Sequence, residues 1–196
     1  MSSLKTPYLL LIPVDGGKLF GYYRLTGQDP GDVLQLDETS GKWSVGPGFL
    51  QTTFAQLYAH QGSTLPSRPC VSGLQLIRTS EGAMTLGGRN LPVAQLYRRV
   101  SGALVRGEVA PGERVRIGVM LHTTAGTDTP FECQATADER GHFEIRFPYP
   151  STGSKGLERR SPVLLIVGIP SANNPPIPIE IPQSAVDEGN VVELIL

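Results

Sequence analysis

The fold class is decided by one stretch, residues 93–149, which reads VAQLYRRVSGALVRGEVAPGERVRIGVMLHTTAGTDTPFECQATADERGHFEIRFPY. Residues 115–121 alternate apolar side chains with polar, small or weakly apolar ones. A period of two is typical of a strand that turns one face to a core. Pro111-Gly112 and Asp138–Gly141 are turn sequences between such strands. We therefore predict an antiparallel β-sandwich or barrel for residues 92–196, of the transthyretin-like or carboxypeptidase-regulatory-like kind.

Residues 1–91 predict a small mixed α/β part, which makes the whole chain α+β. The continuous apolar run 8–14 is typical of a buried strand. Residues 47–60 have apolar side chains at helical spacing and predict an amphipathic helix that ends before Gly62. We expect this helix to pack its apolar face onto the first sheet through Phe54, Leu57 and Tyr58. A further strand is predicted at 71–78, and a loop or hinge at Gly87–Asn90.

Composition excludes several classes of protein. The 196 residues carry 17 Lys and Arg against 18 Asp and Glu, a net charge of −1. This nearly balanced charge gives no net positive field that would attract nucleic acid, so nucleic acid is not expected as a partner. The longest apolar run, 8–14, is far shorter than the roughly 20 residues of a membrane-spanning helix, and it lacks the layout of a secretory signal. By these criteria alone a cytoplasmic location is the default.

The sequence allows two states of the two cysteines, a disulfide or two free thiols. Cys70 and Cys133 are far apart in the sequence, and neither has a Cys or His partner at metal-ligand spacing. A disulfide is compatible with this pattern, but we favour two buried thiols, because free cysteine is among the most buried residue types.

No catalytic constellation is visible. His60, His122 and His142 fall in three separate predicted elements, and no pair has the spacing of a metal site on a helix. No serine has the Gly-x-Ser-x-Gly setting of a hydrolase, and the Gly-Gly-Lys sequence at residues 16–18 is not a phosphate-binding loop. We therefore predict no catalytic residue, no metal site and no cofactor in this chain.

An ordered set of short motifs carries a family resemblance. Its members are Thr53–Tyr58, Leu74–Ser80, Tyr97, Val100–Ala103, Gly107, Ala110–Gly112, Thr123–Gly126, Asp138–Gly141 and Phe147–Tyr149. In content and order they resemble the C-terminal half of the catalytic subunits of archaeal oligosaccharyltransferases, the membrane enzymes of protein N-glycosylation. The resemblance covers roughly residues 6–150. It implies a domain that follows a polytopic membrane half.

The resemblance also implies a substrate-binding motif. The family has Asp-x-x-Lys followed seven residues later by Ile or Met, and this chain has Asp15, Lys18 and Leu25 at those places. The family uses the motif to recognise the Asn-x-Ser/Thr acceptor sequence and to support the lipid-linked donor. The alternative is an Asp-Gly-Gly turn with a solvated lysine, because two glycines weaken a helix.

Other parts of the enzyme are missing from the sequence. The family's Trp-Trp-Asp-Tyr-Gly motif is absent, and the single tryptophan is Trp43. The family's divalent metal, Mn²⁺ or Mg²⁺, is bound by membrane-loop carboxylates outside this sequence. The resemblance thus implies a domain inactive alone that acts with a membrane subunit, on the extracytoplasmic side, with an acceptor peptide or glycan as ligand. The alternative is a non-catalytic β-sandwich module that contacts glycans or another protein.

Overall fold

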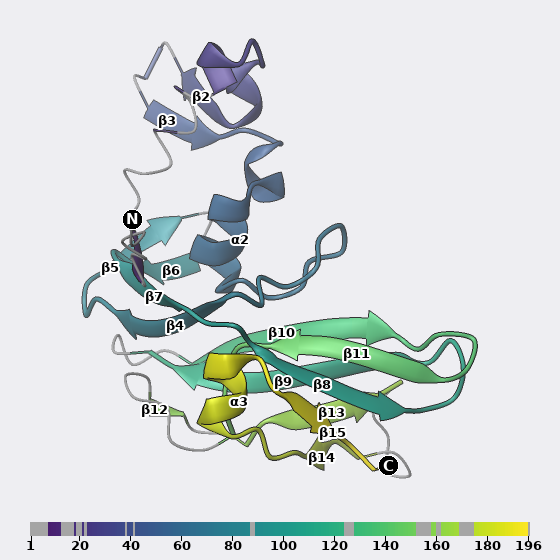
Figure 1. Ribbon diagram of the computed structural model, residues 1–196. Helices are drawn as coiled ribbons and strands as arrows, with labels where there is room; N and C mark the ends of the chain where they lie inside the picture. The colour runs from purple at the N-terminus through teal and green to yellow at the C-terminus, as the bar shows by residue number, and fades with distance from the viewer. Residues whose placement is uncertain are drawn as a thin grey trace, which may run out of the picture.

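The computed structural model describes residues 8–12, 18, 21, 23–37, 39–40, 42–86, 89–123, 128–151, 158–159, 162–168 and 175–195. The predicted α+β class is confirmed. Figure 1 shows three tiers: a small hairpin lobe, a middle tier in which one helix lies beside a sheet, and a β-sandwich. The sandwich is open at its edges, so the sandwich alternative holds and the closed barrel does not.

The middle sheet has the strand order β1-β7-β4. Its members are β1 (Tyr8–Leu11), β7 (Gln95–Arg99) and β4 (Leu74–Thr79), paired antiparallel. β7 belongs to the stretch for which we predicted the sandwich or barrel, yet it is the central strand of the first sheet. The boundary between residues 91 and 92 stays a prediction.

The buried-strand prediction for residues 8–14 is wrong where the structure describes them. Tyr8 is 52% exposed and Leu10 57%, and only Leu11, at 7%, reaches the core. The reason is position in the sheet: β1 is an edge strand, paired with β7 on one side. Residues 13 and 14 lie outside the described residues.

Helix α2 (Thr53–His60) is shorter than predicted. It follows the 3-10 turn η2 (Phe49–Gln51), and Thr52 caps it by accepting a hydrogen bond from the backbone N–H of Ala55 at 3.0 Å. The helix ends where Gln61 takes a left-handed conformation at φ 52°, directly before Gly62. The expected stop is therefore confirmed, but the start is six residues later than residue 47.

The helix is anchored on β7 through its own backbone. The Tyr97 hydroxyl donates to the Leu57 carbonyl at 2.7 Å, and the Gln95 amide donates to the Tyr58 carbonyl at 2.6 Å. Leu57 and Tyr58 are buried, and the half-buried Phe54 ring stacks on Tyr58 with centroids 5.5 Å apart. The expected packing of this helix face onto the first sheet is confirmed.

Two hairpins flank the middle sheet. The lobe contains η1 (Pro30–Asp32) and the paired strands β2 (Leu34–Asp37) and β3 (Lys42–Val45), none of which the sequence pattern indicated. A second hairpin pairs β5 (Ala83–Leu86) with β6 (Arg89–Pro92). The loop expected at Gly87–Asn90 is therefore wrong for its last two residues, which are strand. The two glycines lie outside the described residues.

The sandwich consists of two facing sheets. One has the order β11-β8-β15, from β11 (His142–Phe147), β8 (Ala103–Glu108) and β15 (Val191–Glu193). The other has the order β10-β9-β13-β14, with β12 (Glu158–Arg159) also paired to β9. Its remaining strands are β9 (Arg114–His122), β10 (Asp128–Thr136), β13 (Leu164–Val167) and β14 (Ile177–Pro178).

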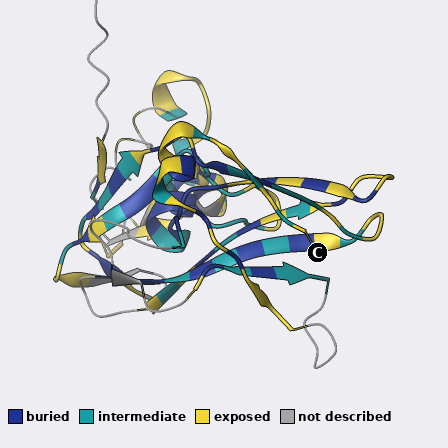
Figure 2. Ribbon diagram, turned by 60° about the horizontal axis from the view of Figure 1, so that its bottom comes forward, coloured by how far each residue is buried: buried dark blue, intermediate teal, exposed yellow. Residues whose placement is uncertain are grey.

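The alternation predicted on β9 is confirmed. Every second residue from Val115 to Leu121 is buried, and the residues between them are half-buried. β8 and β11 follow the same rule, with Val105, Phe143 and Ile145 on the inner face. Figure 2 shows this alternation of buried and more exposed residues along the sandwich strands. The core therefore lies between the two sheets.

The C-terminal segment departs from a purely antiparallel plan. Helix α3 (Gln183–Glu188) precedes β15, and β15 pairs with β8 in parallel. The Arg98 guanidinium on β7 donates to Asp187 on α3 at 2.8 Å and thereby ties the middle sheet to this helix. A helix of six residues is too short for the periodicity that sequence patterns can detect, so α3 was not predicted.

The cysteine expectation is wrong. Cys70 and Cys133 form a disulfide, with their Cα atoms 5.2 Å apart. Cys133 lies on β10 in the sandwich core, whereas Cys70 lies in the connection between α2 and β4. The bond therefore joins the middle tier to the sandwich, across a sequence separation of 63 residues.

Candidate functional site

The structure describes two of the three predicted site residues. Lys18 and Leu25 both have helical backbone and exposed side chains, and Leu25 is 89% exposed. Asp15 lies outside the described residues. The pairing of Asp15 with Lys18 stays a prediction.

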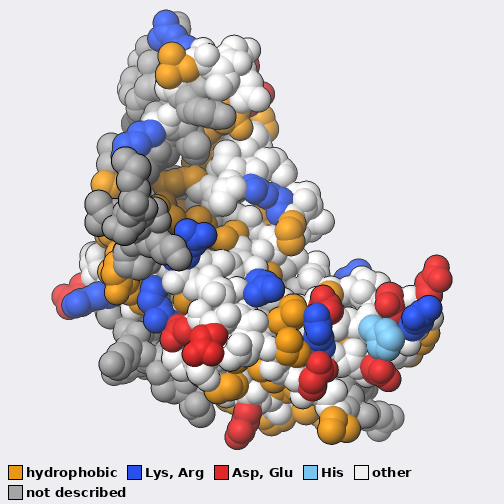
Figure 3. All heavy atoms as spheres, viewed as in Figure 1, with side chains coloured by type: hydrophobic (Ala, Val, Ile, Leu, Met, Phe, Trp, Pro, Cys, Tyr) orange, Lys and Arg blue, Asp and Glu red, His pale blue; other side chains and the backbone are white. Residues whose placement is uncertain are grey.

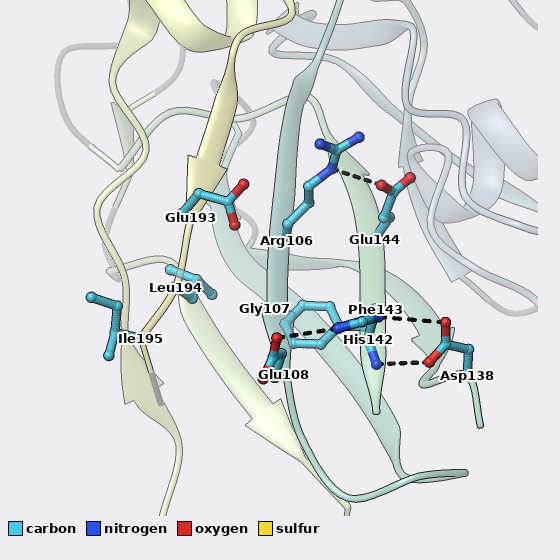
Figure 4. Close-up of a pocket in the computed structure, with 10 residues that line it drawn as sticks. All are labelled: Arg106, Gly107, Glu108, Asp138, His142, Phe143, Glu144, Glu193, Leu194 and Ile195. Atoms are coloured by element: carbon cyan, nitrogen blue, oxygen red, sulfur yellow. Dashed lines mark hydrogen bonds and ion pairs between the residues drawn. The ribbon is translucent and has the colours of Figure 1, made fainter. Parts of the chain in front are cut away.

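A hollow of about 670 Å³ lies on the sheet β11-β8-β15, toward the end where β8 stops. Figure 3 shows acidic and basic side chains gathered on this part of the sandwich. The residues that line the hollow come from three strands, from the connection between β10 and β11, and from the two residues after β15 (Figure 4): Arg106, Gly107, Glu108, Asp138, His142, Phe143, Glu144, Glu193, Leu194 and Ile195.

Cross-strand register brings the charged groups of the hollow together. Arg106 lies opposite Glu144, and its Nε is 2.6 Å from a carboxylate oxygen. Glu108 lies opposite His142, whose Nε2 is 3.1 Å from that carboxylate. Directly opposed opposite charges stabilise an antiparallel pair modestly. Several polar side chains of this face are thus paired with one another.

His142 is also close to a second carboxylate. Its Nδ1 is 3.8 Å from Asp138. The Asp138 carboxylate accepts backbone N–H bonds from His142 and Arg140, each 2.9 Å long. These bonds, that of His142 first, lower the pKa of Asp138, with smaller help from the nearby charges. Asp138 therefore stays ionised at neutral pH and closes the turn between β10 and β11.

The floor of the hollow is an aromatic ring laid over a glycine. A Cβ on Gly107 would come within 2.9 Å of the Phe143 ring, so no larger residue fits there. With carboxylates, one guanidinium and one imidazole above this floor, the hollow can hydrogen-bond a hydroxylated or cationic ligand. From the sequence we named Gly107, Asp138 and His142 in separate contexts and missed this cluster. The alternation of Arg106 and Glu108 against His142 and Glu144 was the available signal.

The tyrosines of the interior have structural roles. Tyr97 and Tyr149 are fully buried, and burial raises the pKa of each well above the ordinary value for tyrosine. Both therefore stay protonated at neutral pH. The hydroxyl of Tyr97 donates to a backbone carbonyl of α2, as described above, and that of Tyr149 accepts from a backbone N–H of β4.

The described residues do not form a metal-binding cluster. Across them, no group of three or more His, Cys, Asp or Glu side chains could hold a metal ion. The family's Mn²⁺ or Mg²⁺ thus finds no fitting set of donors in this part of the chain, and we derive no step through a metal. His60, His122 and His142 lie on α2, β9 and β11. Of the helices the structure describes, none is long and apolar enough to cross a membrane.

Comparison with family models finds one match. Residues 102–192 match the archaeal glycosylation protein B long peripheral domain. The matched segment runs from β8 into β15 and includes the motifs Ala110–Gly112, Asp138–Gly141 and Phe147–Tyr149. No curated protein matches the chain significantly.

Solved structures of the Archaeoglobus fulgidus oligosaccharyltransferase have the same fold. The complex with Zn and sulfate superposes with a TM-score of 0.72 at 14% identity, over 97% of this chain and 33% of that protein. AglB bound to an inhibitory peptide and a dolichol-phosphate gives a TM-score of 0.70 at 14% identity, over 96% and 30%. The enzyme tethered to an acceptor peptide with the NVT sequon gives 0.71 at 14% identity, over 96% and 31%.

This chain spans about a third of the length of the proteins that it matches. At such low identity the likeness shows the fold, and it extends over the middle tier as well as the sandwich. The resemblance inferred from the sequence motifs is therefore confirmed: residues 102–192 match the archaeal glycosylation protein B long peripheral domain, and the chain has the fold of the peripheral globular part of an archaeal oligosaccharyltransferase.

Proposed function

We propose that this chain serves protein N-glycosylation as the peripheral part of an oligosaccharyltransferase, together with a membrane-embedded catalytic part. The observation that carries the proposal is the extent of the fold match, 97% of this chain at a TM-score of 0.72. A generic β-sandwich would match over the sandwich alone. Here the helix α2, the sheet β1-β7-β4 and the sandwich match together.

The roles that we assign to this chain and to the membrane-embedded part follow from two features of the chain. Its sequence has no Trp-Trp-Asp-Tyr-Gly motif, and its described residues hold no metal-binding group. We infer that the membrane-embedded part supplies the divalent metal and the donor, while this chain contributes to the binding of the acceptor. The structures of relatives with an acceptor peptide and with a dolichol-phosphate support these two ligand classes.

The proposed contact point of this chain is the segment with Asp15, Lys18 and Leu25. An exposed lysine can meet a phosphate or a hydroxyl of the substrate. Leu25, almost fully exposed, offers an apolar surface seven residues further along the chain. Since half of such a site would come from the membrane-embedded part, we expect weak binding by this chain alone.

We also propose an extracytoplasmic location. The Cys70–Cys133 disulfide supports it, because structural disulfides persist mainly in oxidising compartments. The family resemblance implies the same side of the membrane, and the default cytoplasmic reading of the sequence has no comparable support.

The proposal is tested in the source organism. Glycopeptide mass spectrometry should show reduced occupancy of Asn-x-Ser/Thr sites after deletion of the gene, restored by the wild-type chain. Lys18→Ala should restore occupancy less well than the matched control Arg24→Ala, which removes another exposed cation close by. Unchanged occupancy after deletion would contradict the proposed function.

One observation favours the alternative, a glycan-binding module. The hollow on β11-β8-β15 offers carboxylates and a guanidinium to sugar hydroxyls. Glycan-array binding that is lost in Arg106→Ala, with glycosylation in cells unaffected by gene deletion, would decide for the alternative.

A further inference from the structure

The connection between α2 and β4, residues 61–73, lies along the free edge of β10. The Thr64 N–H donates to the Glu132 carbonyl at 2.8 Å. The Ser63 hydroxyl accepts from the Glu132 N–H at 3.2 Å and donates to the Pro130 carbonyl at 3.3 Å. β10 is the first strand in the order β10-β9-β13-β14, so these contacts cover backbone groups of an edge strand.

The same connection is tied firmly to α2. The Gln56 amide on the helix donates to the carbonyls of Ser63 at 2.9 Å and Pro69 at 2.7 Å. The Val71 N–H donates to the Gly62 carbonyl at 2.7 Å and closes the loop on itself. The connection therefore belongs to the helix as a preformed loop, and it meets β10 as a unit.

Three hydrogen bonds and one covalent bond hold this loop to the sandwich. The covalent bond is the disulfide from Cys70, at the end of the loop, to Cys133, next to Glu132 on β10. Each hydrogen bond contributes only modestly in net terms. The disulfide is therefore the strongest single attachment of the loop to β10.

One polar group at the start of the loop is left unsatisfied beside β10. The Gln61 side chain is buried, and its Oε1 has no hydrogen-bond partner among the described residues. A buried acceptor without a donor costs free energy, and this cost is relieved if the side chain reaches water when the loop leaves β10. The left-handed backbone of Gln61 belongs to the cap of α2 and does not depend on this contact.

We propose that the Cys70–Cys133 disulfide is a covalent lock between the middle tier and the sandwich, which a dithiol reductant opens. In the oxidised chain the loop covers the edge of β10. In the reduced chain the loop leaves β10 and exposes that edge, while both sheets of the sandwich stay folded. The proposal is independent of the glycosylation role.

The chemistry is ordinary thiol–disulfide exchange with a dithiol reductant. Cys70 is half-buried and Cys133 fully buried, so the thiolate of the reductant attacks Sγ of Cys70. The protein S–S bond breaks, and Cys133 leaves as a thiolate that takes up a proton. The second thiol of the reductant then displaces Cys70, which is also protonated. The reductant becomes a cyclic disulfide, and two electrons pass to the protein.

Hydrogen-exchange mass spectrometry of the whole purified chain tests the lock. With dithiothreitol, the two amides that bond across the contact, those of Thr64 and Glu132, should exchange about 30- to 1,000-fold faster, the factor that corresponds to a typical disulfide. Amides of β8 and β9 should still exchange only by global unfolding and should stay slower than these two. Cys70→Ser should exchange like the reduced wild type and should not respond to dithiothreitol. Ser67→Ala, an exposed change in the same loop, should exchange like the oxidised wild type.

Three results would overturn the proposal. Unchanged exchange of the Thr64 and Glu132 amides after reduction would show that the hydrogen bonds alone hold the loop. Exchange of the β8 and β9 amides as fast as that of Thr64 would show that the bond maintains the fold rather than locks the loop. Two free thiols in the air-oxidised chain, counted by alkylation and intact mass, would remove the bond itself.

Discussion

The backbone N–H of Leu76 donates a hydrogen bond of 3.0 Å to the hydroxyl of Tyr149. Leu76 lies on β4, at the edge of the middle sheet, and Tyr149 follows β11 of the sandwich. Both residues are buried, and the Tyr149 ring packs edge-on against Phe131 and Phe147. Tyr149, which ends the motif Phe147–Tyr149, thus accepts the hydrogen bond of a backbone N–H at the edge of the middle sheet.

Tyr149→Phe should test this contact. The ring and its packing remain, but the Leu76 N–H is left buried without an acceptor, so we expect the free energy of unfolding to fall by about 1–3 kcal/mol. Urea denaturation followed by circular dichroism measures the change. Tyr8→Phe, at an exposed tyrosine, is the matched control and should leave stability within about 0.5 kcal/mol of wild type. Equal stability of the two variants would contradict the role given to Tyr149.

Stability should fall at alkaline pH because of the buried tyrosines. Burial raises the folded-state pKa of Tyr97 and Tyr149, so the native chain holds these protons after the unfolded chain, with a tyrosine pKa near 10, has released them. Their contribution is fully present below pH about 10 and is lost as the pH rises above it. Each tyrosine lowers the free energy of unfolding by up to about 1.4 kcal/mol per pH unit. In Tyr149→Phe, urea titrations between pH 9 and about 11 should show a shallower decline.

The inner face of the sandwich should be sensitive to truncation. Leu121 and Phe143 are buried, so Leu121→Ala should cost about 2–5 kcal/mol and Phe143→Ala about 3–5 kcal/mol. Phe143→Ala also uncovers Gly107, across which its ring lies. Leu25→Ala, at an exposed leucine, is the control. Thermal unfolding measures the stability of all three variants. Wild-type stability of both Leu121→Ala and Phe143→Ala would contradict the assignment of these residues to the inner face of the sandwich.

The disulfide should contribute a large share of stability. It closes a loop across 63 residues, for which the chain-entropy model gives about 4 kcal/mol. The fall in free energy of unfolding on reduction should be close to that of Cys70→Ser, and reduction should not affect the variant further. A reduced wild type as stable as the oxidised one would show that the bond does not constrain the unfolded chain.

The chain alone should have no transferase activity. With a lipid-linked oligosaccharide and an Asn-x-Thr peptide, we expect no glycopeptide with or without Mn²⁺ or Mg²⁺. The reason is the absence of the Trp-Trp-Asp-Tyr-Gly motif from the sequence and of a metal-binding group from the described residues. Metal-dependent glycopeptide detected by mass spectrometry would refute the proposed dependence on a membrane-embedded part.

Binding at Lys18 should be weak and local. An exposed lysine contact with an anion is worth about 0.5–1.5 kcal/mol, so millimolar binding is the expected ceiling. NMR titration with sequon peptide and with pyrophosphate should shift signals of residues 15–25 in wild type and in Arg24→Ala, but not in Lys18→Ala. Identical shifts in Lys18→Ala would show that Lys18 does not contribute to binding.

The sequence by itself determined the sandwich class, the inner face of β9, the presence and the end of helix α2, and the family resemblance. The alternation along residues 115–121, the turn at Asp138–Gly141 and the helical spacing around Phe54 are local patterns within one element. Such patterns report which face of an element is apolar, and here they did so correctly.

Only the tertiary structure decided which elements meet. It placed β1 at an exposed edge, made β7 the centre of the first sheet, paired β15 in parallel with β8, and joined Cys70 to Cys133. It also set Arg106 against Glu144 across two strands. These are contacts between segments far apart in the chain, and residue patterns encode the face of a strand but not its partner.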